Sequence, residues 1–366
     1  MERLTNIVSS IIANLALLHR GKPQARRLAI PMEHRKATRY DRPGFGMLPK
    51  VIDQMAVLGL IIKHPAVAKE RRTGIEATGW LLEALAAPAL PLADIGRASG
   101  EEVIKLAARA GRDRRGRKLP SIPVDYKDCR TADRLREEME EINTFLAKQK
   151  IELDGEPQAA VRLARYYLLR KPSDPHEFML HGRLYGGFWQ SLPKARRGGL
   201  TINGEPIADL DFASMFPRLC YARVGAIPPE GDLYAIPGLE GHRAAVKAGL
   251  SALLSSGSEM ARLPSDVKAA LPAGWTAKRL RDAVAVKHPA LMPLFGKDIG
   301  LDLMHYESCI MVAVLLRLAS LGIPGLPMHD GLMVPRSFAT RAKRAMEFLV
   351  VQMTGTQIVS VVKATN

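Results

Sequence analysis

Two aspartates far apart in the sequence each lie where an apolar, strand-like run ends. Asp211 follows the apolar run that begins at Ile207, and a tight turn and a helical pattern come after it. Apolar residues flank Asp330-Gly331, and aspartate followed by glycine fits hairpin turns that need positive φ. If these strand ends meet in one sheet, the two carboxylates could hold two divalent cations about 4 Å apart for in-line phosphoryl transfer.

The residues around both aspartates resemble motifs of template-dependent polymerases. Asp211-Phe-Ala-Ser214-Met-Phe216-Pro217 is similar to motif A, and its residue pattern is closer to that of B-family DNA polymerases. Met328-His329-Asp330-Gly331 is similar to the histidine-aspartate motif C of the A family; Gly331 replaces a glutamate that the phage RNA polymerases also lack. Over about residues 180–340 the chain thus resembles the superfamily of A-family DNA polymerases and single-subunit phage and mitochondrial RNA polymerases. This resemblance implies that Asp211 and Asp330 bind two Mg²⁺ ions, with Mn²⁺ as a substitute.

Two further matches lie between these motifs. Gly231-Asp232-Leu233-Tyr234 is similar to an aspartate-containing element that follows motif A in the family. Arg243 and Lys247 have the arginine-x3-lysine spacing of motif B, which places both cations on one helix face. The resemblance implies that both bind the nucleotide triphosphate and that Lys247 can protonate the leaving pyrophosphate. Ser251 stands where the family has an aromatic residue, so the usual stacking under the new base pair is in doubt.

The resemblance assigns roles to several other residues. Ser214 belongs to the nucleotide site, and Phe216 stands where DNA polymerases block a ribose 2′-hydroxyl, although it could equally be a core residue. His329 is expected to pack or to hydrogen-bond near the site rather than act as a base. An upstream segment that contacts primer and template in the family is matched by Arg183, Tyr185, Lys194, Arg196 and Arg197.

Asp209 is an alternative to Asp211. The two aspartates are two residues apart, so both would point to the same face of a strand. Asp209 could be the metal ligand or could pair with a basic neighbour. The register of motif A favours Asp211.

Positive charge is concentrated at the start of the chain. The formal net charge is +16, and residues 1–120 hold 22 lysines and arginines against 11 aspartates and glutamates. Such a surface suits a polyanion, most often nucleic acid, although it could serve solubility only. The densest cluster contains Arg112, Arg114, Arg115, Arg117 and Lys118. We expect this cluster to contact phosphates.

The pattern over residues 48–85 resembles the end of a winged helix-turn-helix domain. It predicts an amphipathic helix that ends at Gly59, a strand over 60–62, a second strand near 71–75 and a helix over about 77–85. Arg71 and Arg72 would lie at or near the wing and contact DNA. A protein-contact role is the alternative.

The predicted fold is α+β in three regions. Residues 1–120 form a basic, winged-helix-like nucleic-acid-binding region, and residues 121–200 form a helical connector or reduced thumb, with helices over 133–148 and about 159–169. Residues 201–366 form a palm with an antiparallel sheet and a helical fingers insertion at about 235–300.

Several classes are excluded by composition. Cys129, Cys220 and Cys309 share no close spacing, which argues against a disulfide scaffold or a cysteine zinc site. The sequence has no uncharged run of about 18 apolar residues and no convincing signal peptide, so we expect no membrane span and a cytoplasmic protein.

The sequence therefore predicts a compact DNA polymerase that extends a 3′-hydroxyl, with nucleic acid template and primer, nucleoside triphosphates and replication proteins as partners. A mobile element, plasmid or phage would suit so small a replication enzyme. The alternatives are a primase or RNA polymerase of the same fold, a catalytically inactive DNA-binding replication initiator or repressor, and a two-metal nuclease.

Overall fold

The chain is a mixed α+β protein in which most strand pairs are antiparallel, as the sequence predicts. In the computed structural model, two compact units comprise Met1–Glu102 with Glu156–Val161, and Val103–Gly155 with Arg162–Asn366. The first division falls at Glu102, earlier than the boundary expected at residue 120. The structure describes residues 2–21, 25–30, 38–41, 45–67, 72–86, 91–96, 100–111 and 119–363.

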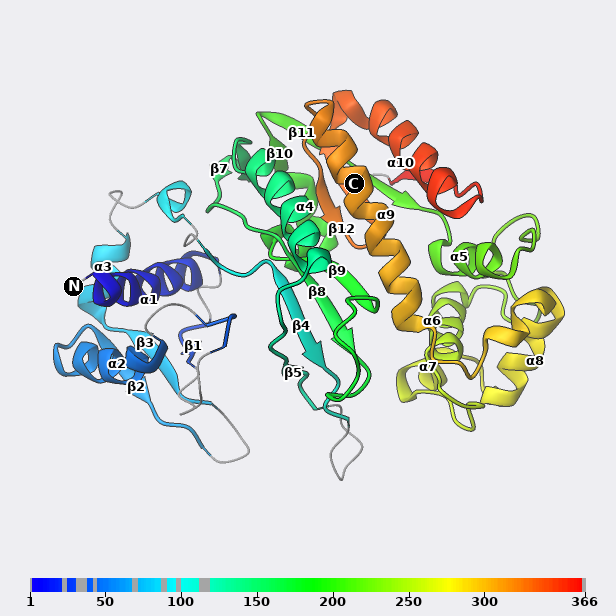
Figure 1. Ribbon diagram of the computed structural model, residues 1–366, viewed down its shortest axis with the longest axis horizontal. Coiled ribbons are helices and arrows are strands. Elements are labelled where there is room, and N and C mark those ends of the chain that lie inside the picture. The colour runs from blue at the N-terminus through cyan, green and yellow to red at the C-terminus, as the bar shows by residue number, and fades with distance from the viewer. Residues whose placement is uncertain are drawn as a thin grey trace. The chain divides into compact units, whose positions relative to one another are not determined.

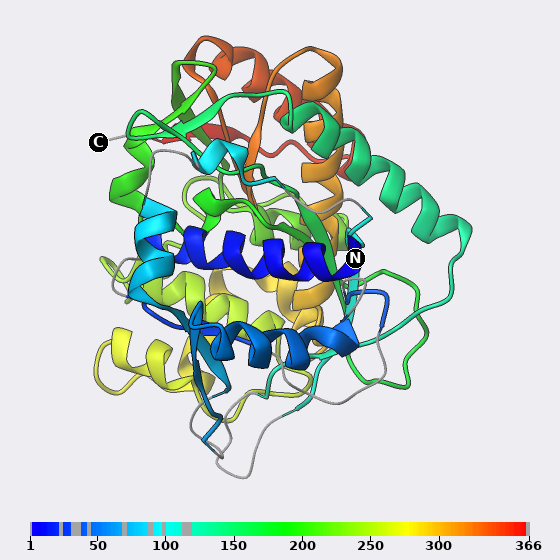
Figure 2. The ribbon, with the colours of Figure 1, turned by 90° about the vertical axis from the view of Figure 1, so that its left-hand side faces the viewer.

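The first unit has three α-helices among its described residues and a small antiparallel sheet of order β1-β3-β2. Figure 2 shows α1 and α2 lying side by side. Helix α2 ends at Val57, and Gly59, two residues later, has φ +70 and separates the helix from β2, close to the predicted helix end. The elements are α1 (Glu2–Gly21), β1 (Leu28–Ala29), η1 (Phe45–Met47), α2 (Leu48–Val57), β2 (Ile61–His64), β3 (Gly74–Ala77), α3 (Gly79–Ala86) and η2 (Leu92–Asp94).

The second unit contains a four-stranded sheet of order β5-β4-β8-β9, in which β4 and β8 are parallel. Helices α4 and α9 pack against this sheet (Figure 1). The buried stripe of α4 consists of the four predicted apolar residues, Leu135, Met139, Ile142 and Leu146. The elements are β4 (Ile104–Ala108), β5 (Ile122–Pro123), α4 (Arg130–Leu146), β8 (Ala164–Leu169), β9 (His181–Tyr185) and α9 (Gly300–Ser320).

The helix predicted around residues 159–169 is wrong, because Ala164–Leu169 forms strand β8. Arg165, Tyr167 and Leu169 alternate inward with a period of two, which is the strand repeat. Together with β5, β6, β7, β9 and β10, this strand makes the range 121–200 a mixed region rather than a helical connector.

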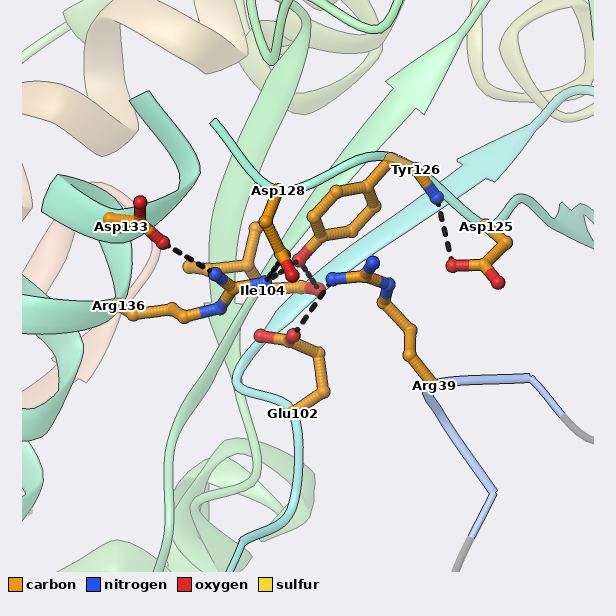
Figure 3. A network of polar contacts seen from close by, with 8 residues as sticks. All are labelled: Arg39, Glu102, Ile104, Asp125, Tyr126, Asp128, Asp133 and Arg136. Atoms are coloured by element: carbon orange, nitrogen blue, oxygen red, sulfur yellow. Dashed lines mark hydrogen bonds and ion pairs between the residues drawn. The ribbon is translucent and has the colours of Figure 1, made fainter. Parts of the chain in front are cut away.

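A polar network fixes the start of α4 on the sheet (Figure 3). The Tyr126 hydroxyl donates to the Ile104 carbonyl at 3.0 Å, and Arg136 Nη2 lies 3.4 Å from the same hydroxyl. Arg136 also pairs with Asp128 at 2.6 Å and Asp133 at 2.8 Å. These bonds connect the chain before α4 to strand β4.

A second sheet has the order β12-β13-β11-β10-β6, and β14 also pairs with β11. Helix α10 packs against β11, β13 and β14, and α5 follows β11 along the chain. The elements are β6 (Ile151–Leu153), β7 (Glu156–Pro157), η3 (Phe188–Ser191), η4 (Lys194–Gly199), β10 (Leu200–Ile202), β11 (Glu205–Phe212), α5 (Met215–Val224), β12 (Leu326–Met328), β13 (Gly331–Pro335), η6 (Arg336–Phe338), α10 (Ala339–Thr354) and β14 (Ser360–Lys363).

Helices fill the range between α5 and α9, where the fingers insertion is expected. They are α6 (Arg243–Leu254), α7 (Ser265–Ala270), α8 (Ala277–Lys287) and η5 (Pro289–Leu294). Helix α6 packs closely on α8, because a Cβ at Gly249 would lie 2.6 Å from Leu280 Cδ2. Figure 1 shows α6, α7 and α8 as one cluster.

Within the part of the chain that the structure describes, α9 is the one helix long and apolar enough to cross a membrane. Half of its apolar window is buried inside the fold. It contacts β9, α4, α5 and α10, as a core helix does.

Candidate functional site

Strands β11 and β13 bring Asp211 and Asp330 together. Asp211 is opposite Gly331 in the antiparallel pair, and the Phe212 N–H donates to the Asp330 carbonyl at 3.1 Å. Burial raises the pKa of Asp211 to about 6, and the negative charge of Asp330 contributes to this rise. Two carboxylates whose charges repel in this way favour a bound cation between them.

Lys363 supplies positive charge at this position. Its Nζ, from β14, lies 2.7 Å from Asp211 Oδ2, and Lys363 and Lys247 both act to lower the pKa of Asp211. The other oxygen of Asp211, Oδ1, is buried and has no hydrogen-bond partner. An unpartnered buried carboxylate oxygen beside a second carboxylate fits a metal ligand.

The described residues contain no group of three or more His, Cys, Asp or Glu side chains that could hold a metal ion. Mg²⁺ needs fewer protein ligands than this, because one or two carboxylates, water and substrate phosphates commonly complete its shell. Asp211 and Asp330 therefore fit the Mg²⁺ that the sequence implies.

Asp209 is also on β11 but is only 5% exposed, and its register partners are Met333 on β13 and Lys363 on β14. The neighbour of the Asp330 turn is Asp211, two residues further along the strand. The geometry agrees with the register that favours Asp211.

The β12–β13 hairpin is present, but its turn differs from the expected one. His329 is the turn residue with positive φ, at +61, and neither Asp330 nor Gly331 has positive φ. Gly331 lies in β13, where a Cβ would be 2.9 Å from the Leu210 carbonyl oxygen and 3.1 Å from Asp211 Oδ1. The glycine is needed for the close approach of the two strands, so a larger residue such as glutamate would crowd Asp211.

Replacing Gly331 with alanine is expected to lower the free energy of unfolding by about 1–3 kcal/mol, because the added methyl overpacks the strand pair. It should also weaken Mn²⁺ binding, measured by electron paramagnetic resonance, since Asp211 Oδ1 must move. Gly79→Ala is the matched control, because nothing lies within 4 Å of its Cβ position. Unchanged Mn²⁺ affinity in Gly331→Ala would contradict this account of the turn.

A buried ion pair lies beside the two aspartates. Arg183 Nε and Nη2 donate to the two carboxylate oxygens of Glu307 at 2.7 and 3.0 Å, and Glu307 is 1% exposed. Burial raises the pKa of Glu307 to about 7 against the effect of Arg183, and the charges of Asp330 and Asp211 add to this rise. Glu307 was not predicted as a site residue, although an acid within the apolar helix α9 was a usable signal.

Arg183 also connects this pair to the segment after β11. Its guanidinium carbon lies 5.7 Å from the centre of the Phe216 ring, in the first turn of α5. Ser214, at the N-terminus of α5, has φ +54 and makes no side-chain capping bond. The resemblance-based residues Arg183, Ser214 and Phe216 therefore belong to one neighbourhood.

His329 packs beside the site. Its ring centre is 5.4 Å from that of Tyr185, and its Nδ1 is buried without a partner. Burial, followed by the charge of Arg183, lowers the pKa of His329 to about 4. The imidazole is therefore neutral at pH 7, in agreement with the packing role that the sequence suggests.

The two motif B cations on α6 have different surroundings. Arg243 makes two bonds to Asp232, at 2.7 and 3.1 Å, and its guanidinium carbon is 5.0 Å from the Tyr234 ring centre. Lys247 is exposed and contributes to the electrostatics of Asp211. Lys247 is thus the α6 cation that acts on Asp211, whereas Arg243 neutralises Asp232.

The other predicted nucleic-acid contacts lie elsewhere. Lys194 is exposed on η4, Arg196 pairs with Asp154, and Arg197 is half-buried with an unpartnered Nε. Arg72 is exposed in the first unit. Arg71, Arg112, Arg114, Arg115, Arg117 and Lys118 lie outside the described residues.

Comparison with protein-family models and with curated proteins found no match to this chain. A functional assignment therefore rests on the residues and geometry of the site.

Proposed function

We propose that this chain is a template-directed nucleotidyltransferase, a small DNA polymerase that extends a 3′-hydroxyl by two-metal-ion catalysis. The observation that carries the proposal is the meeting of Asp211, at the end of β11, with Asp330, in the turn before the neighbouring antiparallel strand β13, while the cation Lys247 acts on Asp211. Phosphoryl transfer needs this combination, because catalysis consists mainly of positioning and charge stabilisation.

In the proposed mechanism, Asp211 and Asp330 would hold the metal ions. Bound Mg²⁺ supplies activation of the primer hydroxyl and neutralisation of the triphosphate charge. Lys247 binds the triphosphate, and Lys363 must withdraw from Asp211 Oδ2 before that oxygen can ligate a cation. The Phe216 ring lies near the Arg183 guanidinium, and in this proposal it is the residue that would block a ribose 2′-hydroxyl.

The first unit supplies the proposed duplex grip. Its order α1-β1-α2-β2-β3, with β3 central in an antiparallel sheet, is compatible with a winged helix. Arg72 lies two residues before the start of β3 and is exposed, as a wing residue would be. Phosphate contacts from this unit would position a duplex without reading its sequence.

The test is primer extension by the unmodified chain with Mg²⁺, on DNA and RNA templates, with deoxynucleotides and ribonucleotides supplied separately. We expect extension with deoxynucleotides on a DNA template. Preference for ribonucleotides would indicate the primase or RNA polymerase alternative. DNA binding without extension on any template would indicate the inactive initiator.

Phe216→Ala is expected to raise ribonucleotide incorporation relative to deoxynucleotide incorporation by about tenfold or more, because the pocket loses the bulk that excludes the hydroxyl. The ratio of kcat/KM for the two nucleotides measures this change. Phe216→Tyr keeps the ring and should keep the selectivity of the unmodified chain. An unchanged ratio in Phe216→Ala would assign Phe216 to the core.

A further inference from the structure

Strand β14 brings a lysine to the carboxylate that the proposed function assigns to a metal ion. β14 pairs antiparallel with β11, and Asp211 lies opposite Val361. Lys363, two residues further along β14, lies opposite Asp209, and its ammonium reaches along the same face of the sheet to Asp211. The contact is an ion pair of 2.7 Å between Lys363 Nζ and Asp211 Oδ2. Lys363 lies outside the motifs on which the polymerase resemblance rests.

Other contacts hold the strand in place. The Ser360 N–H donates to Glu347 Oε1 of α10 at 2.9 Å, and Ser360 itself is fully buried. The Ala213 N–H, just after β11, donates to the Val359 carbonyl at 2.9 Å. These bonds fix the start of β14 independently of the ion pair, so the strand delivers Lys363 to Asp211 from a set position.

The side chain of Lys363, in contrast, has room to leave Asp211. It is 36% exposed, whereas the side chain of Asp211 is 19% exposed. Its neighbour Val362 is 54% exposed, so this part of β14 borders solvent. A lysine has a flexible four-carbon stem and a strongly hydrated ammonium. The ammonium can therefore exchange the carboxylate for water by side-chain rotation, while β14 stays paired with β11.

A divalent cation and this ammonium compete for one carboxylate. Asp211 Oδ2 is bonded to Lys363, whereas Oδ1 is buried and has no hydrogen-bond partner. Both oxygens belong to the same group, so a cation on Oδ1 would lie within a few ångströms of the ammonium. Like charges at that range repel strongly near a protein surface. The ion pair must therefore break when Asp211 and Asp330 take up a divalent cation.

We propose that Lys363 is an internal competitor for the cation site and sets how tightly that site holds a divalent cation. The inference rests on the metal site of the proposed function and on none of its later steps. Lys363 keeps the affinity for free Mg²⁺ low. A triphosphate that arrives with its own Mg²⁺ also brings phosphate oxygens, which can receive the released ammonium. The site thus favours the metal–nucleotide complex over the free cation.

The test is Mn²⁺ binding measured by electron paramagnetic resonance, without primer, template or nucleoside triphosphate. Lys363→Met removes the ammonium and keeps an unbranched apolar stem. It is expected to tighten Mn²⁺ binding by about tenfold, because a charge-assisted hydrogen bond no longer competes for Asp211.

Lys343→Met is the matched control. Lys343 is 38% exposed and pairs with Glu347 on α10 at 3.8 Å, so its replacement removes the same charge from a similarly exposed position. Mn²⁺ affinity should stay within about twofold of the unmodified chain, since salt screens the more distant charge. Melting temperatures in EDTA establish that each variant is folded.

Equal Mn²⁺ affinity of the unmodified chain and folded Lys363→Met would overturn the proposal. Equal tightening in Lys363→Met and Lys343→Met would do so too, because net charge alone would explain the gain. The result is separable from polymerase activity. Tighter binding in Lys363→Met alone, with no primer extension by the unmodified chain, would uphold the role of Lys363 and reject the proposed enzyme. Primer extension with equal Mn²⁺ affinities would do the reverse, and absence of Mn²⁺ binding in every protein would reject the competitor and the metal site together.

Discussion

Asparagine in place of Asp211 or Asp330 is expected to slow primer extension by about 1,000-fold or more, while the fold remains intact. Each substitution removes a charged metal ligand, and metal-ion stabilisation of a phosphoryl-transfer transition state is worth several kcal/mol. Single-turnover extension at saturating Mg²⁺ measures the chemical step. Mn²⁺ binding should weaken in the same variants, which gives a second readout.

Stability provides the control for this prediction. Asp330 contributes to the raised pKa of Asp211, so Asp330→Asn removes a repulsion in the metal-free protein. The melting temperature of Asp330→Asn in EDTA should therefore equal or exceed that of the unmodified chain. Asp209→Asn, two residues along the same strand, should retain extension within about threefold, since small effects are usual away from the reacting groups. If Asp209→Asn abolished extension and Asp211→Asn did not, the assigned strand register would be incorrect.

Local patterns predicted the elements that hold the site. The apolar run before Asp211, the two short runs around Asp330 and the stripe of α4 all appear as the expected strands and helix. These predictions succeeded because hydrophobic periodicity and turn residues act over a few neighbouring positions. The predicted position of positive φ in the hairpin was wrong, because His329 adopts it rather than Asp330 or Gly331. Gly331 is needed instead for the close approach of Leu210 and Asp211. That approach depends on strand pairing, which the local pattern does not contain.

Contacts over long sequence separations could not be read in the same way. Arg165 is a buried cation that donates to the Gly182 carbonyl at 2.9 Å and to Ser308 Oγ at 3.2 Å. With these partners it can point inward from β8, but the sequence window around it shows only a mixed polar and apolar run. Lys363 is distant from Asp211 in sequence, and only the β11–β14 pairing brings the two together.

Removal of the Arg183 side chain is expected to have the largest effect on stability. Arg183→Ala leaves the carboxylate of Glu307, which is 1% exposed, without its partner. Breaking a buried ion pair in this way typically costs about 3–5 kcal/mol. Urea denaturation at pH 8 in EDTA measures the loss. The double variant Arg183→Met with Glu307→Met should recover much of it, because no unpaired charge remains.

The pH dependence follows from the same group. The pKa of Glu307 is raised to about 7 in the folded chain, above its ordinary value of 4.5, so the folded state retains the proton over this interval. The stabilising contribution of Glu307 is therefore complete below pH 4.5 and is lost as the pH rises through 7. Glu307→Gln should reduce the fall in unfolding free energy between pH 5 and pH 8 by roughly 2–3 kcal/mol. If the unfolding free energy fell equally in the unmodified chain and in Glu307→Gln, the folded chain would keep Glu307 ionised over the whole pH range. The ion pair with Arg183 would then be what holds it ionised.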